Sequence, residues 1–225
     1  TPLGSVILAK KARTDLTGAP GAVAAAGLAV CARRARRELD ERMVPLAGLV
    51  AAFIFAVQMV NFPILPGVSG HLLGGALAAI LVGPNTGALC IGIVLVVQSL
   101  LFADGGVSAL GTNITNMALI GVATAYATAV AVFRMLGHRR LAAVSFVAAL
   151  IGTVCSAMGF ILEYAIGGAA QVSLTSVGGY LLGTHVLIGI GEGVITALTV
   201  TAVARSRPDL VYLLRPQRLT AGAAA

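Results

Sequence analysis

The sequence predicts an all-α polytopic membrane protein with about seven transmembrane helices. Hydrophobic residues make up 58% of the 225-residue chain and charged residues only 10%, whereas soluble domains carry roughly 25% charged residues. Apolar runs recur along the chain at about the length needed to cross a bilayer. The 28 glycines suit helices that pack closely through small residues.

The apolar runs predict the spans in chain order. The first is short and rich in alanine, and the third is short and follows an irregular bend. The predicted ranges are 19–35, 43–61, 69–83, 87–103, 113–134, 141–163 and 182–204. We expect residues 1–18 to form an atypical N-terminal segment, 19–204 the transmembrane domain and 205–225 a cytoplasmic tail.

The formal net charge of +7 is explained by the positive-inside rule rather than by nucleic-acid binding. Arginines cluster after the first, fifth and seventh spans, which alternation places on one side of the membrane. We therefore expect the C-terminus inside, the N-terminus outside, and multi-pass insertion in the cell inner (plasma) membrane. Lys10, Lys11 and Arg13 do not fit this pattern. The charge run over residues 33–42 is interpreted as a solvated cytoplasmic loop.

One polar, irregular stretch, QMVNFPILPGVSGHLLGG (residues 58–75), interrupts the apolar sequence. Its prolines and Gly67 break helical hydrogen bonding. Irregular backbone at membrane depth is tolerated where it is buried in protein or lines a cavity. We expect His71 to lie in the first turn of the following helix and to face a cavity, with Gln58 and Asn61 beside it.

Further polar residues gather toward the predicted outer side. Asp104 follows the fourth span, Asn113 and Asn116 open the fifth, and His185 is expected in the first turn of the seventh. Glu192 is seven residues beyond His185, on the same helix face and about 10 Å along the axis. Other interpretations stay open: an interfacial histidine bonded to a loop, a carboxylate paired for helix packing, and a turn residue for Asp104.

No enzyme motif is present. The sequence lacks HExxH, GxSxG and GxxxxGK[ST], which excludes the usual signatures of zinc proteolysis, serine hydrolysis and ATP binding. An intramembrane hydrolase that uses His185 and Glu192 stays open on residue type alone. Cys31, Cys90 and Cys155 are odd in number and lie within apolar runs, which predicts small buried residues rather than a disulfide or metal set. We predict a non-enzyme without a cofactor.

Three stretches resemble the CbiM/NikM family: residues 43–89 with NFPILPGVSGHLLGG, residues 97–121 with LLFADGGVSALGTNITNM, and HVLIGIGEGVIT near residue 190. The family comprises substrate-binding membrane components of energy-coupling factor transporters for cobalt and nickel. The resemblance implies Co²⁺ or Ni²⁺ as transported ligand, with cobalt favoured. It also implies three partners, namely a transmembrane coupling subunit, a cytoplasmic ATPase pair and a small additional membrane subunit.

The resemblance implies a metal ligand at His71, joined by the N-terminal amine and a histidine at the second position. Nitrogen donors of this kind suit Ni(II) and related ions. Members of the family begin Met-His-Ile/Val-Pro-Asp-Gly, whereas this sequence begins TPLGSV and has no histidine before His71. We therefore expect weak metal binding by the chain as printed. The alternative is a non-transporting structural or regulatory membrane paralogue.

Overall fold

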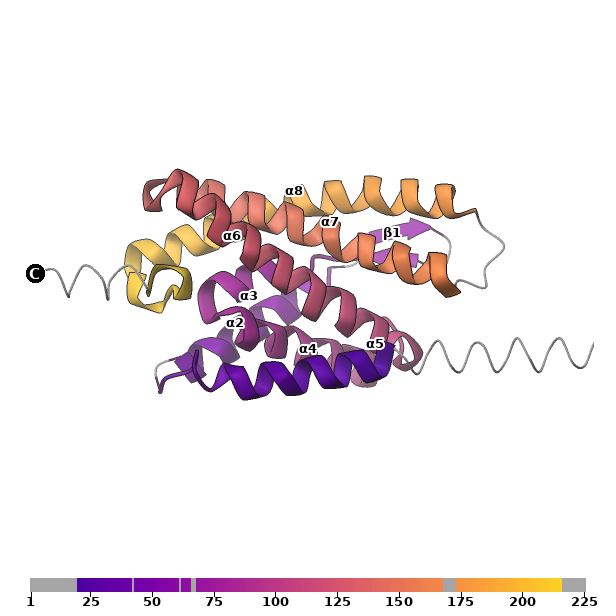
Figure 1. The fold of residues 1–225 in the computed structure, drawn as a ribbon, viewed down its shortest axis with the longest axis horizontal. Helices are drawn as coiled ribbons and strands as arrows, with labels where there is room; N and C mark the ends of the chain where they lie inside the picture. The colour runs from indigo at the N-terminus through magenta and orange to yellow at the C-terminus, as the bar shows by residue number, and fades with distance from the viewer. Residues whose placement is uncertain (1–19, 42, 61, 66–67, 168–172, 216–225) are drawn as a thin grey trace, which may run out of the picture.

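The fold is an elongated bundle of helices with one short β-hairpin (Figure 1). The computed structural model describes residues 20–215 apart from 42, 61, 66–67 and 168–172. Residues 20–35 form the first helix. It is followed by α2 (Met43–Gln58), β1 (Phe62–Leu65), β2 (Val68–Gly70), α3 (Gly75–Val82) and α4 (Pro84–Leu101).

The second half of the chain supplies the longest helices. A continuous helical stretch runs through η1 (Val107–Ala109), α5 (Leu110–Asn113), the π-helical η2 (Ile114–Gly121) and α6 (Val122–Leu136). After η3 (His138–Arg140) come α7 (Leu141–Gly167) and α8 (Leu174–Ser206), and the described chain closes with η4 (Pro208–Leu210) and η5 (Tyr212–Leu214).

Seven apolar helices thus lie within the described ranges, as the sequence predicted. Four of them are long and apolar enough to cross a membrane: Pro84–Leu101, Val107–Leu136, Leu141–Gly167 and Leu174–Ser206. In contrast, α3 has only 8 residues, or about 12 Å of helix. Every residue of α3 is buried, so it is a core element enclosed by its neighbours.

The predicted start of the third helix is wrong. Val68–Gly70 pairs antiparallel with Phe62–Leu65, with Phe62 opposite Gly70 and Pro63 opposite Ser69. The helix begins only at Gly75, so His71 precedes it instead of lying in its first turn. Two features explain the late start: Gly74 has a left-handed backbone (φ 78°), and a carboxylate distant in the sequence accepts hydrogen bonds from the amides of Leu73 and Gly74.

The last helix also begins earlier than predicted. α8 starts at Leu174, after Ser173, whose hydroxyl accepts a hydrogen bond from the Ser176 amide at 3.2 Å. This serine is an ordinary helix cap. His185 therefore lies three turns inside α8 rather than in its first turn. Because α8 is continuous, His185 and Glu192 still share one face, as predicted.

Small residues bring the long helices close together, as the glycine content suggested. A Cβ atom added to Gly152 of α7 would lie 2.7 Å from the Cβ of Ala125 on α6. One added to Gly193 of α8 would lie 2.6 Å from the ring of Phe146 on α7. Any larger side chain at these glycines would force the helices apart.

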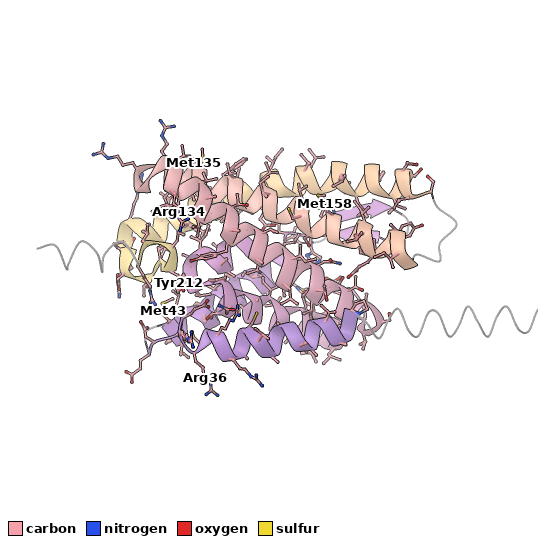
Figure 2. All side chains as sticks on the ribbon, in the orientation of Figure 1. Arg36, Met43, Arg134, Met135, Met158 and Tyr212 are labelled. Carbon is pink, nitrogen blue, oxygen red and sulfur yellow. The ribbon has the colours of Figure 1, made fainter. Side chains whose placement is uncertain are left out.

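The arginine-rich turns lie at one end of the bundle, where Figure 2 labels Arg36 and Arg134 together with Tyr212. The described C-terminal segment folds back onto this end. Val211 and Leu213 are buried, and Arg215 donates to the Glu38 carbonyl and forms an ion pair with Asp40, both at 3.3 Å.

The interpretation of residues 33–42 as a solvated loop is wrong for Glu38. Arg33, Arg34, Arg36 and Arg37 are exposed, but Glu38 is only 5% exposed. Its carboxylate accepts hydrogen bonds from the amide and hydroxyl of Thr86, at 2.7 and 3.0 Å, and from the backbone and side-chain nitrogens of Asn85. Glu38 thus caps the N-terminus of α4, which begins at Pro84.

Candidate functional site

The centre of the candidate site is residues 71–74, called the His71 segment below, where the chain leaves the hairpin and enters α3. The segment has no regular secondary structure. The Gln58 side chain of α2 donates to the Leu73 carbonyl at 2.7 Å. The Glu192 carboxylate of α8 accepts from the Leu73 amide at 2.9 Å and from the Gly74 amide at 3.0 Å.

Glu192 is itself held from a third helix. The Thr153 hydroxyl of α7 donates to Glu192 Oε2 at 3.0 Å. Glu192 is 4% exposed, Thr153 1% and Gln58 0%. A buried carboxylate requires several donors, and an unsatisfied buried amide costs about 1–3 kcal/mol. The network therefore satisfies the irregular backbone and holds the His71 segment in one position.

The two histidines nearest this network share one hydrogen-bonding pattern. His71 Nδ1 lies 2.9 Å from the Leu72 carbonyl oxygen, and His185 Nδ1 lies 2.8 Å from the Leu181 carbonyl oxygen. A carbonyl oxygen can only accept, so Nδ1 carries the proton in each ring. In the neutral form of each imidazole, Nε2 then keeps its lone pair, the arrangement found in metal-binding histidines.

The structure brings together three of the residues singled out from the sequence, namely Gln58, Glu192 and His71. Gln58 and Glu192 bond the His71 segment directly. His185 lies on α8 seven residues before Glu192 and on the same helix face. Both histidines are half-buried.

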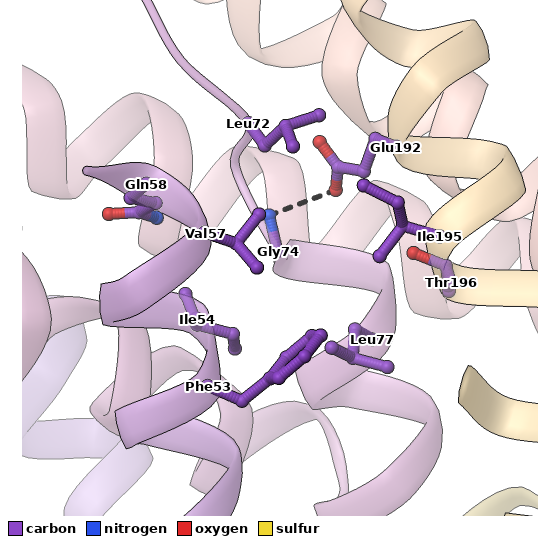
Figure 3. A pocket seen from close by; sticks show the side chains of 10 residues that line it. All are labelled: Phe53, Ile54, Val57, Gln58, Leu72, Gly74, Leu77, Glu192, Ile195 and Thr196. Atoms are coloured by element: carbon purple, nitrogen blue, oxygen red, sulfur yellow. Dashed lines mark hydrogen bonds between the residues drawn. The ribbon is translucent and has the colours of Figure 1, made fainter. Parts of the chain in front are cut away.

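A small, largely apolar pocket adjoins the network (Figure 3). Its lining includes one segment from Leu72 past Gly74 to Leu77 and another from Glu192 to Thr196. Along each segment, the lining leads away from the histidine. Phe53, Ile54 and Val57 of α2 complete the apolar wall. A wall of this kind offers few ligands for an ion, so the histidine end of the site is the part suited to metal chemistry.

The other predicted site residues contact different elements. Asn116 lies in the π-helical η2 and donates to Glu163 Oε2 of α7 at 3.0 Å. Asn113 packs against Gly105 in the loop after α4, where a Cβ on Gly105 would lie 2.6 Å from Asn113 Nδ2. Asp104 lies in the same loop, and its amide donates to the Gln98 carbonyl at 3.2 Å. Asn61 lies outside the described residues.

Thr153 is the member of the network that sequence reasoning missed. It stands in the long apolar helix α7, 39 positions before Glu192, and a single threonine in an apolar run has no pattern that distinguishes it. Within the residues that the structure describes, no three histidine, cysteine, aspartate or glutamate side chains gather as a metal-ion cage. Cys31, Cys90 and Cys155 are free thiols; Cys90 is buried as predicted, whereas Cys31 and Cys155 are only half-buried.

Comparison with known proteins agrees with this architecture. Residues 14–210 match the CbiM family model, described as the cobalt uptake substrate-specific transmembrane region. A protein of Haloquadratum walsbyi, provisionally named a metal transport protein, is 40% identical over 192 residues, which is 85% of each chain. The fused nickel transport protein NikMN of Rhodobacter capsulatus is 33% identical, over 85% of this chain and 58% of its own length.

A solved structure has the same fold. The crystal structure of a truncated transition metal transporter superposes with a TM-score of 0.78 at 26% identity, covering 85% of this chain and 94% of that one. The proteins to which this chain is similar are transport proteins rather than enzymes.

Proposed function

Since the chain belongs to the CbiM family of cobalt-uptake transmembrane regions, we propose that it is the substrate-binding membrane subunit of an energy-coupling factor transporter for divalent transition-metal ions. Co²⁺ is the favoured substrate and Ni²⁺ the next. The metal is cargo, and no resident cofactor is proposed. The protein is proposed to lie in the inner (plasma) membrane, with the arginine-rich end of the bundle in the cytoplasm.

One observation carries the proposal: a histidine-bearing, non-helical segment is held inside a membrane-type bundle by buried polar groups from three helices. Irregular backbone at such depth is tolerated where it is enclosed by protein or lines a site. Intramembrane ionisable residues mark transport pathways by default. We assign the His71 imidazole as a metal ligand, with its lone pair at Nε2.

The remaining polar residues have supporting roles in this proposal. Gln58 and Glu192 hold the His71 segment, and Asn116 with Glu163 ties the π-helical stretch to α7. A π-helical turn inside an α-helix often accompanies a functional site. Asp104 and Asn113 shape the loop at the opposite end from the arginines, which we propose faces outward.

Transport requires partners, because the chain has no nucleotide-binding loop. We propose a transmembrane coupling subunit, a cytoplasmic ATPase pair and a small additional membrane subunit. The first helix offers a surface for the coupling subunit, since Ala22 and Ala26 are exposed on it. Ala22→Leu with Ala26→Leu should weaken complex formation, and complex formation that is fully retained would exclude this face.

Metal uptake tests the function directly. Cells that express the chain with its partner subunits should accumulate ⁵⁷Co²⁺ or ⁶³Ni²⁺, and His71→Ala should remove the accumulation. The matched control is His138→Ala, in the η3 turn between α6 and α7, which should transport normally. Purified protein whose thermal midpoint is unchanged by Co²⁺ and Ni²⁺, together with absent uptake, would favour the non-transporting paralogue.

A further inference from the structure

We propose that His185 is a second imidazole ligand, so that His71 and His185 bind one transition-metal ion together through their Nε2 atoms. The inference rests on the proposed function in one respect, the assignment of His71 as a ligand. It adds a donor from the last helix, which is supplied neither by the hairpin region nor by the N-terminal segment.

The register of two chain segments supports this pairing. Leu73 and Gly74 are fastened to Glu192 by hydrogen bonds of 2.9 and 3.0 Å. From Leu73, two residues of non-helical chain lead back toward the hairpin, so His71 lies at most about 7 Å away. From Glu192, seven residues of helix lead back about 10 Å to His185 on the same face.

Both segments run in the same direction from their shared anchor. The hairpin strand β1 lies at the end of the bundle where α7 ends and α8 begins (Figure 1). His71, next to the hairpin, and His185, in the first half of α8, therefore lie toward the same end of the bundle.

The hydrogen bonds of the two rings prepare them for an ion. Each Nδ1 is occupied by a backbone carbonyl, at 2.9 Å for His71 and 2.8 Å for His185. A ligating histidine usually donates its other ring N–H to such a partner, which fixes its tautomer and orientation. With both Nδ1 atoms protonated, the pair offers two neutral nitrogen donors, and these suit Co²⁺, Ni²⁺ and Cu²⁺.

The environment favours an ion between the rings over a purely structural histidine pair. In the absence of an ion, the dipoles of the two half-buried imidazoles repel each other. The rings also cannot form a hydrogen bond with each other, because both Nε2 atoms are acceptors. A cation satisfies both lone pairs at once. The backbone carbonyls of Leu72 and Leu181 then stabilise the polarised N–H groups.

The test counts imidazoles on a bound metal. The full chain, purified in detergent, is titrated with Cu²⁺ as the probe because it binds nitrogen sites most tightly among these ions. Electron spin echo modulation then distinguishes one bound imidazole from two. We expect two imidazoles in the unchanged chain and one in both His71→Ala and His185→Ala, with His138→Ala unchanged.

Affinity and a conservative variant separate a ligand from a structural residue. His185→Asn keeps an N–H where Nδ1 donates to Leu181 but removes Nε2. Second-shell changes already weaken metal sites about 10–100-fold, so loss of this ligand should weaken Co²⁺ binding by at least about tenfold in His185→Asn. If His185→Asn has normal thermal stability and binds Co²⁺ as tightly as the unchanged chain, whereas His185→Ala does not, the role of His185 is structural and the proposal is overturned.

The two proposals fail in different ways. If Cu²⁺ and Co²⁺ bind neither the unchanged chain nor its variants, or bind His71→Ala as tightly as the unchanged chain, the His71 assignment and this inference both fall. If His71→Ala loses the metal while His185→Ala keeps the affinity and the imidazole count of the unchanged chain, only the His185 ligand is wrong.

Discussion

Glu192 Oε2 lies 2.9 Å from the backbone nitrogen of Leu73, a residue 119 positions earlier in the chain. The same carboxylate reaches Gly74 through its other oxygen, at 3.0 Å. The Glu192 side chain of α8 thus caps the short buried helix α3, which would otherwise lack a cap. The stability of α3 and the position of His71 therefore depend on the same group.

Replacing Glu192 with glutamine should lower the stability of α3 and loosen the position of His71. Glutamine has one carbonyl oxygen, so one of the three donors from Leu73, Gly74 and Thr153 would face an NH₂ group. An unsatisfied buried donor costs about 1–3 kcal/mol, and the thermal midpoint in detergent should fall accordingly. Co²⁺ affinity should fall about tenfold, as expected for a second-shell group. Glu41→Gln, at an exposed glutamate, is the matched control and should change neither quantity.

Glu38 should contribute to stability in the same way at the other end of the bundle. Glu38→Ala leaves the Asn85 and Thr86 amides without their acceptor, and loss of such a cap costs about 0.5–2 kcal/mol. Detergent unfolding curves should show this loss, whereas Glu41→Ala, three residues along, should stay within about 0.5 kcal/mol of the unchanged protein. Equal effects of the two substitutions would contradict the assignment of Glu38 as a buried cap.

Gly83, between α3 and α4, should not tolerate a side chain. Its φ is 97°, and an added Cβ would lie 2.8 Å from the carboxyl group of Glu38. Gly83→Ala should therefore destabilise the protein by at least about 1–2 kcal/mol. Gly179→Ala is the control, because nothing lies within 4 Å of its added Cβ. In α8 that substitution should be neutral or stabilising by up to about 1 kcal/mol. Matching losses at both positions would show that the Gly83 turn is not special.

The two ends of the bundle should lie on opposite sides of the membrane. In a chain whose three native cysteines are replaced by alanine, Arg139→Cys should react with a membrane-impermeant maleimide only after the cells are opened. Ser173→Cys, at the other end of α7 and α8, should react in intact cells. The reason is that the arginine-rich turns lie together at one end of the bundle, which the positive-inside rule places in the cytoplasm. Labelling of both positions from outside would reverse or abolish this topology.

The docked C-terminal segment should loosen at alkaline pH. Burial raises the pKa of the Tyr212 phenol, and the Glu38 carboxylate raises it further, against a smaller opposing effect of Arg215. The folded protein thus favours the neutral phenol, and this contribution is lost as the pH rises above about 10, where the unfolded chain ionises. Tyr212→Phe should flatten the fall of the thermal midpoint between about pH 9 and 11. Tyr180→Phe, at an exposed tyrosine, should leave the fall unchanged.

Much of the fold follows from patterns in the sequence. Composition alone predicts a membrane protein, and the apolar runs predict seven helices, of which α2, α4 and α7 begin within three residues of expectation. His185 and Glu192 are correctly placed on one face because helical spacing is independent of where the helix starts. These properties depend only on local periodicity and length.

The errors occur where distant contacts decide local structure. An apolar run over 69–83 reads as one helix, but Glu192 satisfies the Leu73 and Gly74 amides and lets the chain stay non-helical until Gly75. Glu38 stands in a run of exposed arginines, and only the N-terminus of α4 makes it a buried acceptor. No local signal marks either partner, because the residues that meet are separated by 47 or more positions.

The enclosed helix α3 also constrains the order in which the protein can be assembled during synthesis. At about 12 Å, it is less than half the thickness of the hydrocarbon layer and cannot leave the translocation channel as a span of its own. The carboxylate that caps it belongs to α8, which is made more than a hundred residues later. The hairpin and α3 must therefore remain loosely inserted until α8 has been made and packs against them.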